Sequence, residues 1–416
     1  MAEQNISAAG TPERWKVLGT TFVAYVYDSY DIIILTVAMP VLLKLLNLSL
    51  SQGGLLVSAT FIGGALGSIL LGMIAENKGR RFALVLSMVA FGLGTGAIYL
   101  INTYAEWLIL RFLCGIALGG LWGPCVAIIS QHWSVKYRAT AAGFVLSSFA
   151  IGGVIAALVG RLVFSYDWRL LFLTGSSAAI AAIYVWWATP DDSKDLKPVA
   201  TGSDAGAEKV RLSEIFASET GRRTILGTML QFLSHGGYWG IITWVPTYLV
   251  QVRHLSLNMM ANFSFIMFFG TFLGYIGFAY LGDKIGRKKA FVACQIWVLI
   301  TVPIYLLIED ATFLFWWSIV TGIGPAGAFT LMGAYFAELF PDRIRALAGG
   351  FCFNVGKLGG VVAPFTVGLI GQYYGLATGL IVAPIVFACG ALVLYFLPET
   401  YRGSIASGSD RNEGMA

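Results

Sequence analysis

The chain alternates between long apolar runs and short polar connections. Twelve runs reach the roughly 20 residues that a helix needs to cross a bilayer core. They span residues 15–43, 51–75, 82–101, 106–130, 139–163, 168–189, 223–250, 258–281, 290–308, 312–337, 345–371 and 375–397. Stretches such as 32–37 are continuously apolar, whereas a membrane strand alternates apolar and polar residues. The pattern therefore predicts an all-α membrane protein with twelve transmembrane helices.

Composition supports this prediction and adds an orientation. Apolar residues make up 57% of the chain and charged residues 12%, whereas soluble domains have about 45–50% and about 25%. Most of the 27 lysines and arginines fall on the side that an even number of spans gives to both termini. Because cytoplasmic loops are rich in basic residues, both termini are expected in the cytoplasm. The net charge of +5 then reflects topology, and no nucleic-acid partner is expected.

The 5 cysteines lie inside apolar runs without metal-ligand spacing, so neither a metal nor a cofactor is expected. The chain also lacks a nucleophile–base set and a nucleotide-binding loop. These observations argue against an enzyme and against transport driven by ATP bound to this chain.

One polar stretch, residues 190–222, separates the first six runs from the last six. The two halves share a pattern at an offset of 207 residues. The paired positions are Glu76 and Asp283, Gly79 and Gly286, Arg80 and Arg287, Gln131 and Glu338, and Arg138 and Arg345. We therefore predict two six-helix bundles, residues 1–189 and 223–400, joined by a cytoplasmic linker and followed by a cytoplasmic tail at 401–416.

Two carboxylates interrupt the first run. Asp28 and Asp31 are three residues apart, so on a helix they share one face. A carboxylate at the centre of a bilayer costs about 3 kcal/mol on insertion scales, and such residues are usually functional. The pair is our candidate site for proton binding.

Two basic residues also fall inside runs. Arg111 lies near one end of the fourth run, with Trp122 further along the same helix face. It is a candidate ligand for an anion, although an arginine so placed can also extend to the membrane surface. Lys357 lies deeper, in the eleventh run. It is either an anion anchor or the partner of Asp28 or Asp31 in a structural ion pair.

The offset of 207 residues maps the aspartate pair onto the seventh run. Asp28 corresponds to His235 and Asp31 to Tyr238, and Gln231 lies on the same helix face. These side chains would give a central cavity a polar wall opposite the aspartates. His235 could relay protons, donate a hydrogen bond as a neutral ring, or simply pack.

The acid-x-x-Gly-Arg-basic segments resemble the cytoplasmic signature of the major facilitator superfamily, as does the spacing Arg111, Gly115 and Gly119. This resemblance implies the family's fold of two pseudo-symmetric bundles. It also implies a cytoplasmic gate of paired charges. The gate residues would be Glu76, Gly79, Arg80, Arg138, Asp283, Gly286, Arg287, Glu338 and Arg345. Glu76 and Gln131 depart from the usual pattern, so the gate of the first half is expected either to be weaker or to use other partners.

Within the family, the segment 27–31 resembles the Asp-x-aromatic-Asp signature of carboxylate:proton symporters, the sialate/lactate/muconate group and the related aromatic-acid group. Segments 340–345 and 350–356 are closer to the first group, which often has arginine where this chain has Lys357. The resemblance implies import of a small, muconate-like organic carboxylate together with a proton by rocker-switch alternating access. The expected substrate contacts are Arg111, Trp122, Gln231, His235, Tyr238, Asn354 and Lys357.

Two other functions fit the same sequence pattern. One is a sugar or multidrug facilitator, and the other is a sensor that binds a ligand without transporting it. In each case we expect a monomer in the inner membrane of a bacterium, with both termini in the cytoplasm.

Overall fold

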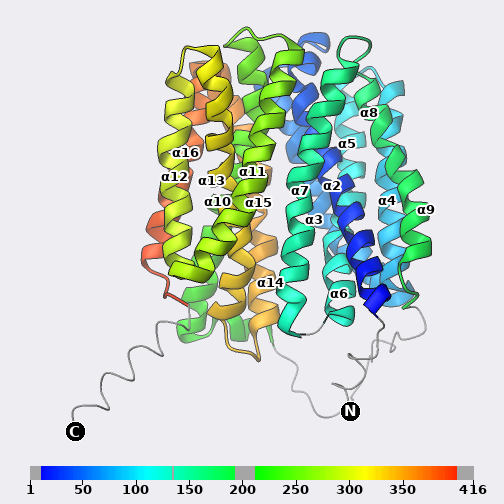
Figure 1. Cartoon of the computed structure of the whole chain (residues 1–416), viewed down its shortest axis with the longest axis vertical. Helices are drawn as coiled ribbons and strands as arrows, with labels where there is room; N and C mark the ends of the chain where they lie inside the picture. Colours follow the sequence, from blue (N-terminus) through cyan, green and yellow to red (C-terminus); the bar gives the residue numbers. More distant parts are fainter. Residues whose placement is uncertain (1–10, 134, 193–210, 401–416) are drawn as a thin grey trace. The chain divides into compact units, whose positions relative to one another are not determined.

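The computed structural model describes residues 11–133, 135–192 and 211–400, and all regular structure in these ranges is helical (Figure 1). The first half contains α2 (Thr11–Leu45), α3 (Leu50–Lys78), α4 (Arg80–Ala97), the 3-10 helix η1 (Ile98–Leu100), α5 (Tyr104–Gly119), α6 (Trp122–His132), α7 (Val135–Val163), α8 (Leu170–Gly175) and α9 (Ser177–Ala188). The second half contains the 3-10 helix η2 (Leu212–Phe216), α10 (Ser218–Gln251), α11 (Leu257–Ile285), α12 (Arg287–Leu307), α13 (Ala311–Leu339), α14 (Arg345–Gly356), α15 (Leu358–Tyr374) and α16 (Leu376–Tyr395). The predicted all-α fold is confirmed.

The described residues include 11 helical stretches that are long and apolar enough to cross a membrane. They coincide with eleven of the twelve predicted runs. The remaining run, the seventh, is α10, whose hydropathy is lowered by Gln231, Ser234 and His235 near its middle. Every residue of α10 from 234 to 249 is nevertheless buried. Because protein encloses this part of the helix, it tolerates polar side chains.

Three predicted spans are interrupted. The fourth is divided into α5 and α6, the sixth into α8 and α9 at Ser176, and the eleventh into α14 and α15 at Lys357. At the first of these breaks, a Cβ on Gly120 would lie only 2.3 Å from Cδ1 of Leu71 and 2.5 Å from Oγ of Ser87. The break therefore lets the chain pass close to α3 and α4.

Glycines bring α3 and α5 into backbone contact. A Cβ on Gly63 would lie 2.1 Å from the carbonyl oxygen of Phe112, and one on Gly67 1.9 Å from that of Ile116. The second half repeats this arrangement 207 residues later. There a Cβ on Gly270 or Gly274 would lie 2.2 Å from the carbonyl oxygen of Ile319 or Ile323, respectively. The repeat seen in the loops thus extends to helix packing.

The contacts within the chain define two compact units. The first comprises Met1–Gly206, Gly240–Phe269 and Val361–Leu380, and the second Ala207–Trp239, Gly270–Gly360 and Ile381–Ala416. The first unit thus takes in parts of α10, α11, α15 and α16. The division into bundles at 1–189 and 223–400 stays a prediction, and most of the predicted linker and the whole tail lie outside the described residues.

Within the first unit, α3 is joined directly to α15 and α10. Oγ of Ser58 donates a hydrogen bond to the carbonyl oxygen of Val361 at 2.6 Å. The indole of Trp244 donates to the carbonyl oxygen of Pro364 at 2.8 Å, and a Cβ on Gly54 would lie 2.4 Å from that same oxygen. A main-chain carbonyl oxygen has two lone pairs, so those of Val361 and Pro364 can accept these bonds in addition to any bond within α15.

Candidate functional site

A buried ion pair joins α2 to α5. Nη1 of Arg111 lies 3.1 Å from Oδ2 of Asp31, and both side chains are almost completely buried, at 0% and 2% exposure. The same nitrogen donates to the main-chain oxygen of Asp31 at 3.4 Å. The close approach of α3 and α5 fixes the helix that carries Arg111, so the partner of Asp31 is held in place.

The ion pair is surrounded on several sides. Oγ1 of Thr95, from α4, donates a short hydrogen bond to Oδ1 of Asp31, and Sγ of Cys114 lies 4.0 Å from that hydroxyl. The ring of Phe172, from α8, lies 5.4 Å from the guanidinium carbon of Arg111. Within the described residues, Nε and Nη2 of Arg111 have no hydrogen-bond acceptor. The guanidinium therefore keeps donors that an anion could use.

Asp28 occupies a different environment on the same helix. It is 9% exposed, so it lies at the edge of the buried region, and it interacts electrostatically with Cys125 of α6. One turn away, the ring of Tyr25 packs against that of Trp122 at a tilt, with ring centroids 4.9 Å apart. The structure thus brings Trp122 to the face of α2 that carries Asp28, while Asp31 faces Arg111.

In the second unit, the predicted polar face of α10 is formed by buried side chains. The amide Nε2 of Gln231 lies 3.2 Å from Nδ1 of His235. With the amide as donor, the hydrogen of a neutral imidazole is on Nε2. The ring of Phe329, from α13, lies 4.9 Å from His235 and 4.7 Å from Tyr238. Gln231, His235 and Tyr238 therefore form one cluster with an aromatic neighbour.

Lys357 lies at the break between α14 and α15. A Cβ on Gly359 would lie 1.9 Å from the carbonyl oxygen of Phe232, and one on Gly356 2.3 Å from Cγ of Gln231, so Gly359 meets the backbone of α10 and Gly356 the side chain of Gln231. Nζ of Lys357 lies 4.7 Å from the ring centroid of Phe353. The ammonium also interacts electrostatically with His235, which places this cation beside the α10 cluster.

Asn354 is the predicted substrate contact that is least enclosed. Its side chain is exposed, and its amide donates to the carbonyl oxygen of Gly350 at 2.9 Å. The side-chain oxygen is the atom left to accept a further hydrogen bond.

The predicted gate residues of the second half form a charge cluster. Arg287 pairs with Asp283, and its Nε lies 3.3 Å from Oε1 of Glu338. The hydroxyl of Thr400 donates to the other oxygen of Glu338 at 2.7 Å. Arg345 pairs instead with Asp342. Asp283, Arg287 and Glu338 are therefore brought together, and Arg345 is engaged elsewhere.

In the first half, the equivalent turn is held by a different acid. Gly79 has a φ of 99°, which favours glycine, and α4 starts directly after it. Asp192 accepts hydrogen bonds from the main-chain nitrogens of Arg80, at 3.0 Å, and Arg81, at 3.4 Å. Glu76 is exposed and has no ion pair within the described residues, and the side chain of Arg138 lies outside them.

Sequence reasoning overlooked Asp192 and its counterpart Glu399. Oε1 of Glu399 accepts a hydrogen bond from the main-chain nitrogen of Lys288 at 3.1 Å, next to Gly286 with its φ of 102°. A carboxylate thus caps the N-terminus of α4 in one half and of α12 in the other. The two acids are 207 residues apart, so the offset already found in the sequence could have identified them.

Phe329 was also overlooked, and the same offset points to it. It lies 207 residues after Trp122, which was among the predicted substrate contacts. In each unit this position carries an aromatic ring beside the helix with the polar face.

Comparison with known proteins gives consistent results. The family model described as Major Facilitator Superfamily matches residues 21–277 and 262–413. The probable 4-methylmuconolactone transporter of Cupriavidus pinatubonensis is 28% identical over 94% of this chain and 92% of its own length. The cis,cis-muconate transport protein of Acinetobacter baylyi is 25% identical, with 92% and 95% covered. The gentisate transporter of Corynebacterium glutamicum is 25% identical, with 92% and 88% covered.

Solved structures show the same fold. The crystal structure of a bacterial homologue of the human lysosomal transporter Spinster, in an inward-facing and unoccupied conformation, superimposes with a TM-score of 0.73. It is 19% identical in sequence, and the match covers 93% of this chain and 97% of that one.

Proposed function

The chain belongs to the major facilitator superfamily and is a transport protein, not an enzyme, and we propose that it imports a small organic carboxylate together with a proton. The observation that carries this proposal is the buried pair of Asp31 and Arg111. The relatives named above support the substrate class, since their names refer to muconate, a muconolactone and gentisate. An unsaturated or aromatic mono- or dicarboxylate, with muconate-like diacids first, is the proposed cargo.

Asp31 is the proposed proton acceptor. While it is ionised, Arg111 and Thr95 stabilise its charge in a site without solvent contact. Protonation removes that charge and releases the guanidinium, because a neutral carboxyl group binds a cation far more weakly. The two protonation states therefore favour different arrangements of α2 and α5, which is what coupling requires. Asp28, at the edge of the buried region, is the proposed entry point for the proton.

Lys357 is the proposed anchor for the substrate carboxylate. It is held beside the α10 cluster, where Gln231, His235 and Tyr238 offer neutral hydrogen-bonding groups. Trp122 and Asn354 remain proposed contacts. Arg111 is fully buried and paired, so its proposed role in anion binding depends on prior protonation of Asp31.

The charge cluster of Asp283, Arg287 and Glu338 and the two capped turns that follow Gly79 and Gly286 are the proposed cytoplasmic gate. The two bundles would then expose the site alternately to either side by rocking. We propose that the protein works as a monomer in the bacterial inner membrane, with both termini in the cytoplasm.

Uptake into proteoliposomes tests the proposal. Radiolabelled cis,cis-muconate should accumulate when the external pH is below the internal pH, and an uncoupler should abolish accumulation. Asp31→Asn should lose accumulation but keep exchange of internal for external substrate, since exchange does not require net proton movement. Asp28→Asn, the matched control three residues away, should slow uptake without abolishing its pH dependence.

Each competing function predicts a different result. Uptake that ignores the pH gradient would refute proton symport. Competition by neutral sugars instead of carboxylates would indicate a sugar facilitator. Binding of muconate without flux would indicate a sensor.

A further inference from the structure

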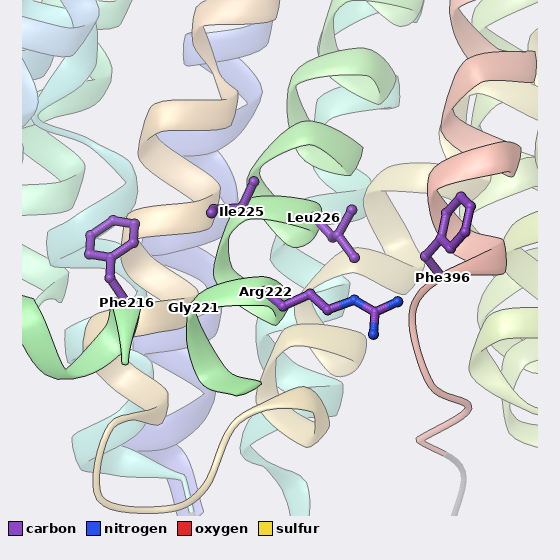
Figure 2. Close-up of a pocket in the computed structure, with 6 residues that line it drawn as sticks. All are labelled: Phe216, Gly221, Arg222, Ile225, Leu226 and Phe396. Carbon is purple, nitrogen blue, oxygen red and sulfur yellow. The ribbon is translucent and has the colours of Figure 1, made fainter. Parts of the chain in front are cut away.

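A groove lies between the start of α10 and the end of α16, within the second unit (Figure 2). Its volume is about 560 Å³. The lining residues are Phe216, Gly221, Arg222, Ile225, Leu226 and Phe396. None of them belongs to the proposed transport site.

The floor of the groove is fixed by η2. Oγ1 of Thr224 donates to the carbonyl oxygen of Ile215 at 2.7 Å, and the side chain of Ile215 is fully buried. A Cβ on Gly221 would lie 2.4 Å from the carbonyl oxygen of Phe216, so η2 touches the backbone of α10. Phe216 in turn packs edge-on against Phe351 of α14 at 5.2 Å. The groove is therefore a formed feature of the fold.

The walls of the groove are apolar and exposed. Phe216, Ile225 and Phe396 are 44%, 54% and 50% exposed. The apolar surface continues along α16 through Leu392 and Tyr395, both largely exposed. Since α16 has the length and composition of a membrane span, we expect lipid acyl chains to contact this apolar surface.

One cation lies among these apolar walls. Figure 2 shows the side chain of Arg222 extending toward Phe396. Within the part of the chain that the structure describes, Arg222 has no carboxylate partner, whereas the adjacent Arg223 lies 3.5 Å from Glu219 and donates to the carbonyl oxygen of Leu339. The groove therefore combines one available guanidinium with exposed hydrocarbon.

We propose that this groove binds an anionic phospholipid of the cytoplasmic leaflet. The headgroup phosphate accepts hydrogen bonds from Arg222, and the acyl chains cover Phe216, Ile225 and Phe396. Guanidinium groups suit phosphate because their paired donors match its oxygens. Inorganic phosphate alone would leave the apolar walls uncovered. The leaflet follows from the proposed topology, whereas the binding site does not depend on the proposed cargo.

Native mass spectrometry of the purified full-length protein tests the site. The protein is released from detergent micelles with phosphatidylglycerol or phosphatidylcholine of identical acyl chains. We expect wild type to retain phosphatidylglycerol preferentially and Arg222→Gln to lower its retention about fivefold, the effect of one basic residue near an anionic lipid. Lys289→Gln, which removes an equally exposed charge from the start of α12, should change retention less than twofold.

A second variant tests the groove without altering its charge. Ile225→Trp fills the apolar wall and should also lower retention, which keeps the test valid if Arg222→Gln does not fold. Retention unchanged in both variants would overturn the proposal, and so would an equal loss in Lys289→Gln. Full displacement of the lipid by inorganic phosphate would identify a phosphate site instead. None of these outcomes bears on muconate uptake, so the two proposals fail separately.

Discussion

The helices α2 and α10 occupy equivalent positions in the internal repeat, yet their polar faces have opposite chemistry. On α2, Asp31 is ionically paired with Arg111. On α10, the equivalent residue is Tyr238, which packs against Phe329. Both faces are buried, but one stabilises separated charges and the other presents neutral groups and aromatic rings.

The two side chains that bind the carboxylate of Asp31 are also missing from the second unit. A shift of 207 residues replaces Arg111 with Ser318 and Thr95 with Val302. Ser318 is buried and donates a hydrogen bond to the carbonyl oxygen of Leu314 in its own helix. A buried carboxylate needs a cation and a hydrogen-bond donor, so losing the acid removes the need for both. The charged set is therefore present in the first unit and absent at the equivalent positions of the second.

In the second unit, the cation beside the polar cluster of α10 is Lys357, which does not correspond to Arg111. Lys357 lies 207 residues after Ala150, so the first unit has no charge at the equivalent position. We infer a division of labour in which the first unit carries the proton acceptor and the second carries the main anchor for the substrate carboxylate. The following variants test that division, from the largest expected effect to the smallest.

Arg111→Gln should be the most damaging change. It leaves Asp31 buried without its cation, which costs about 3–5 kcal/mol. The measurement is the thermal unfolding midpoint in detergent, with Ser318→Ala as the matched control at the equivalent position. The double variant Arg111→Gln with Asp31→Asn should recover most of the loss. Equal midpoints for Arg111→Gln and Ser318→Ala would refute a structural ion pair.

Lys357→Gln should weaken substrate binding without uncoupling transport. Losing a hydrogen bond to a charged group costs about 1.5–3 kcal/mol, so KM should rise at least tenfold. The pH dependence of initial uptake rates should persist, in contrast to Asp31→Asn. Lys357→Arg, which keeps the charge, serves as the control. A loss of pH dependence in Lys357→Gln would contradict the division of labour.

Phe329→Leu should reduce discrimination between planar and flexible acids. Aromatic contacts contribute about 0.5–1.5 kcal/mol beyond area burial, which corresponds to a severalfold change in affinity. The measurement is the ratio of KM values for cis,cis-muconate and its saturated analogue adipate. Trp122→Leu is the matched variant in the first unit. A larger change of the ratio in Trp122→Leu would move substrate recognition to that unit.

The capping acids should show the smallest and most symmetric effects. Asp192→Asn and Glu399→Gln each remove a charge from a helix N-terminus, worth about 0.3–1 kcal/mol. The two unfolding midpoints should fall by similar small amounts. A much larger shift in one variant would show that the two turns are not equivalent.

The sequence predicted the helices well and their interruptions poorly. The breaks at Gly120, Ser176 and Lys357 fall inside stretches that the sequence predicts as single spans, although each contains small or polar residues. Each break depends on what another helix brings to that point, such as Leu71 and Ser87 beside Gly120, and local pattern does not record this. The twelve spans could be counted because hydrocarbon excludes polar backbone whatever the tertiary contacts.

The sequence pointed to residues of the candidate site where burial is costly. The cost of charge in a membrane identified Asp28, Asp31, Arg111 and Lys357, but not which aspartate pairs with Arg111, because that depends on the rotation of α2 against α5. Phe329 was one aromatic residue among many. Asp192 and Glu399 looked like ordinary acids in polar loops.

The glycines beside Lys357 have a consequence for substrate range. Gly359 packs directly on the main chain at Phe232, and Gly356 packs on the side chain of Gln231, so the segment around Lys357 lies close against α10. This side of the proposed site can adjust to a substrate only by side-chain rotation, because sliding of α15 along α10 would bring backbone atoms into collision. Because the dimensions of the proposed site are fixed on this side, the carrier should discriminate between acids of different length more strongly than between acids of different saturation.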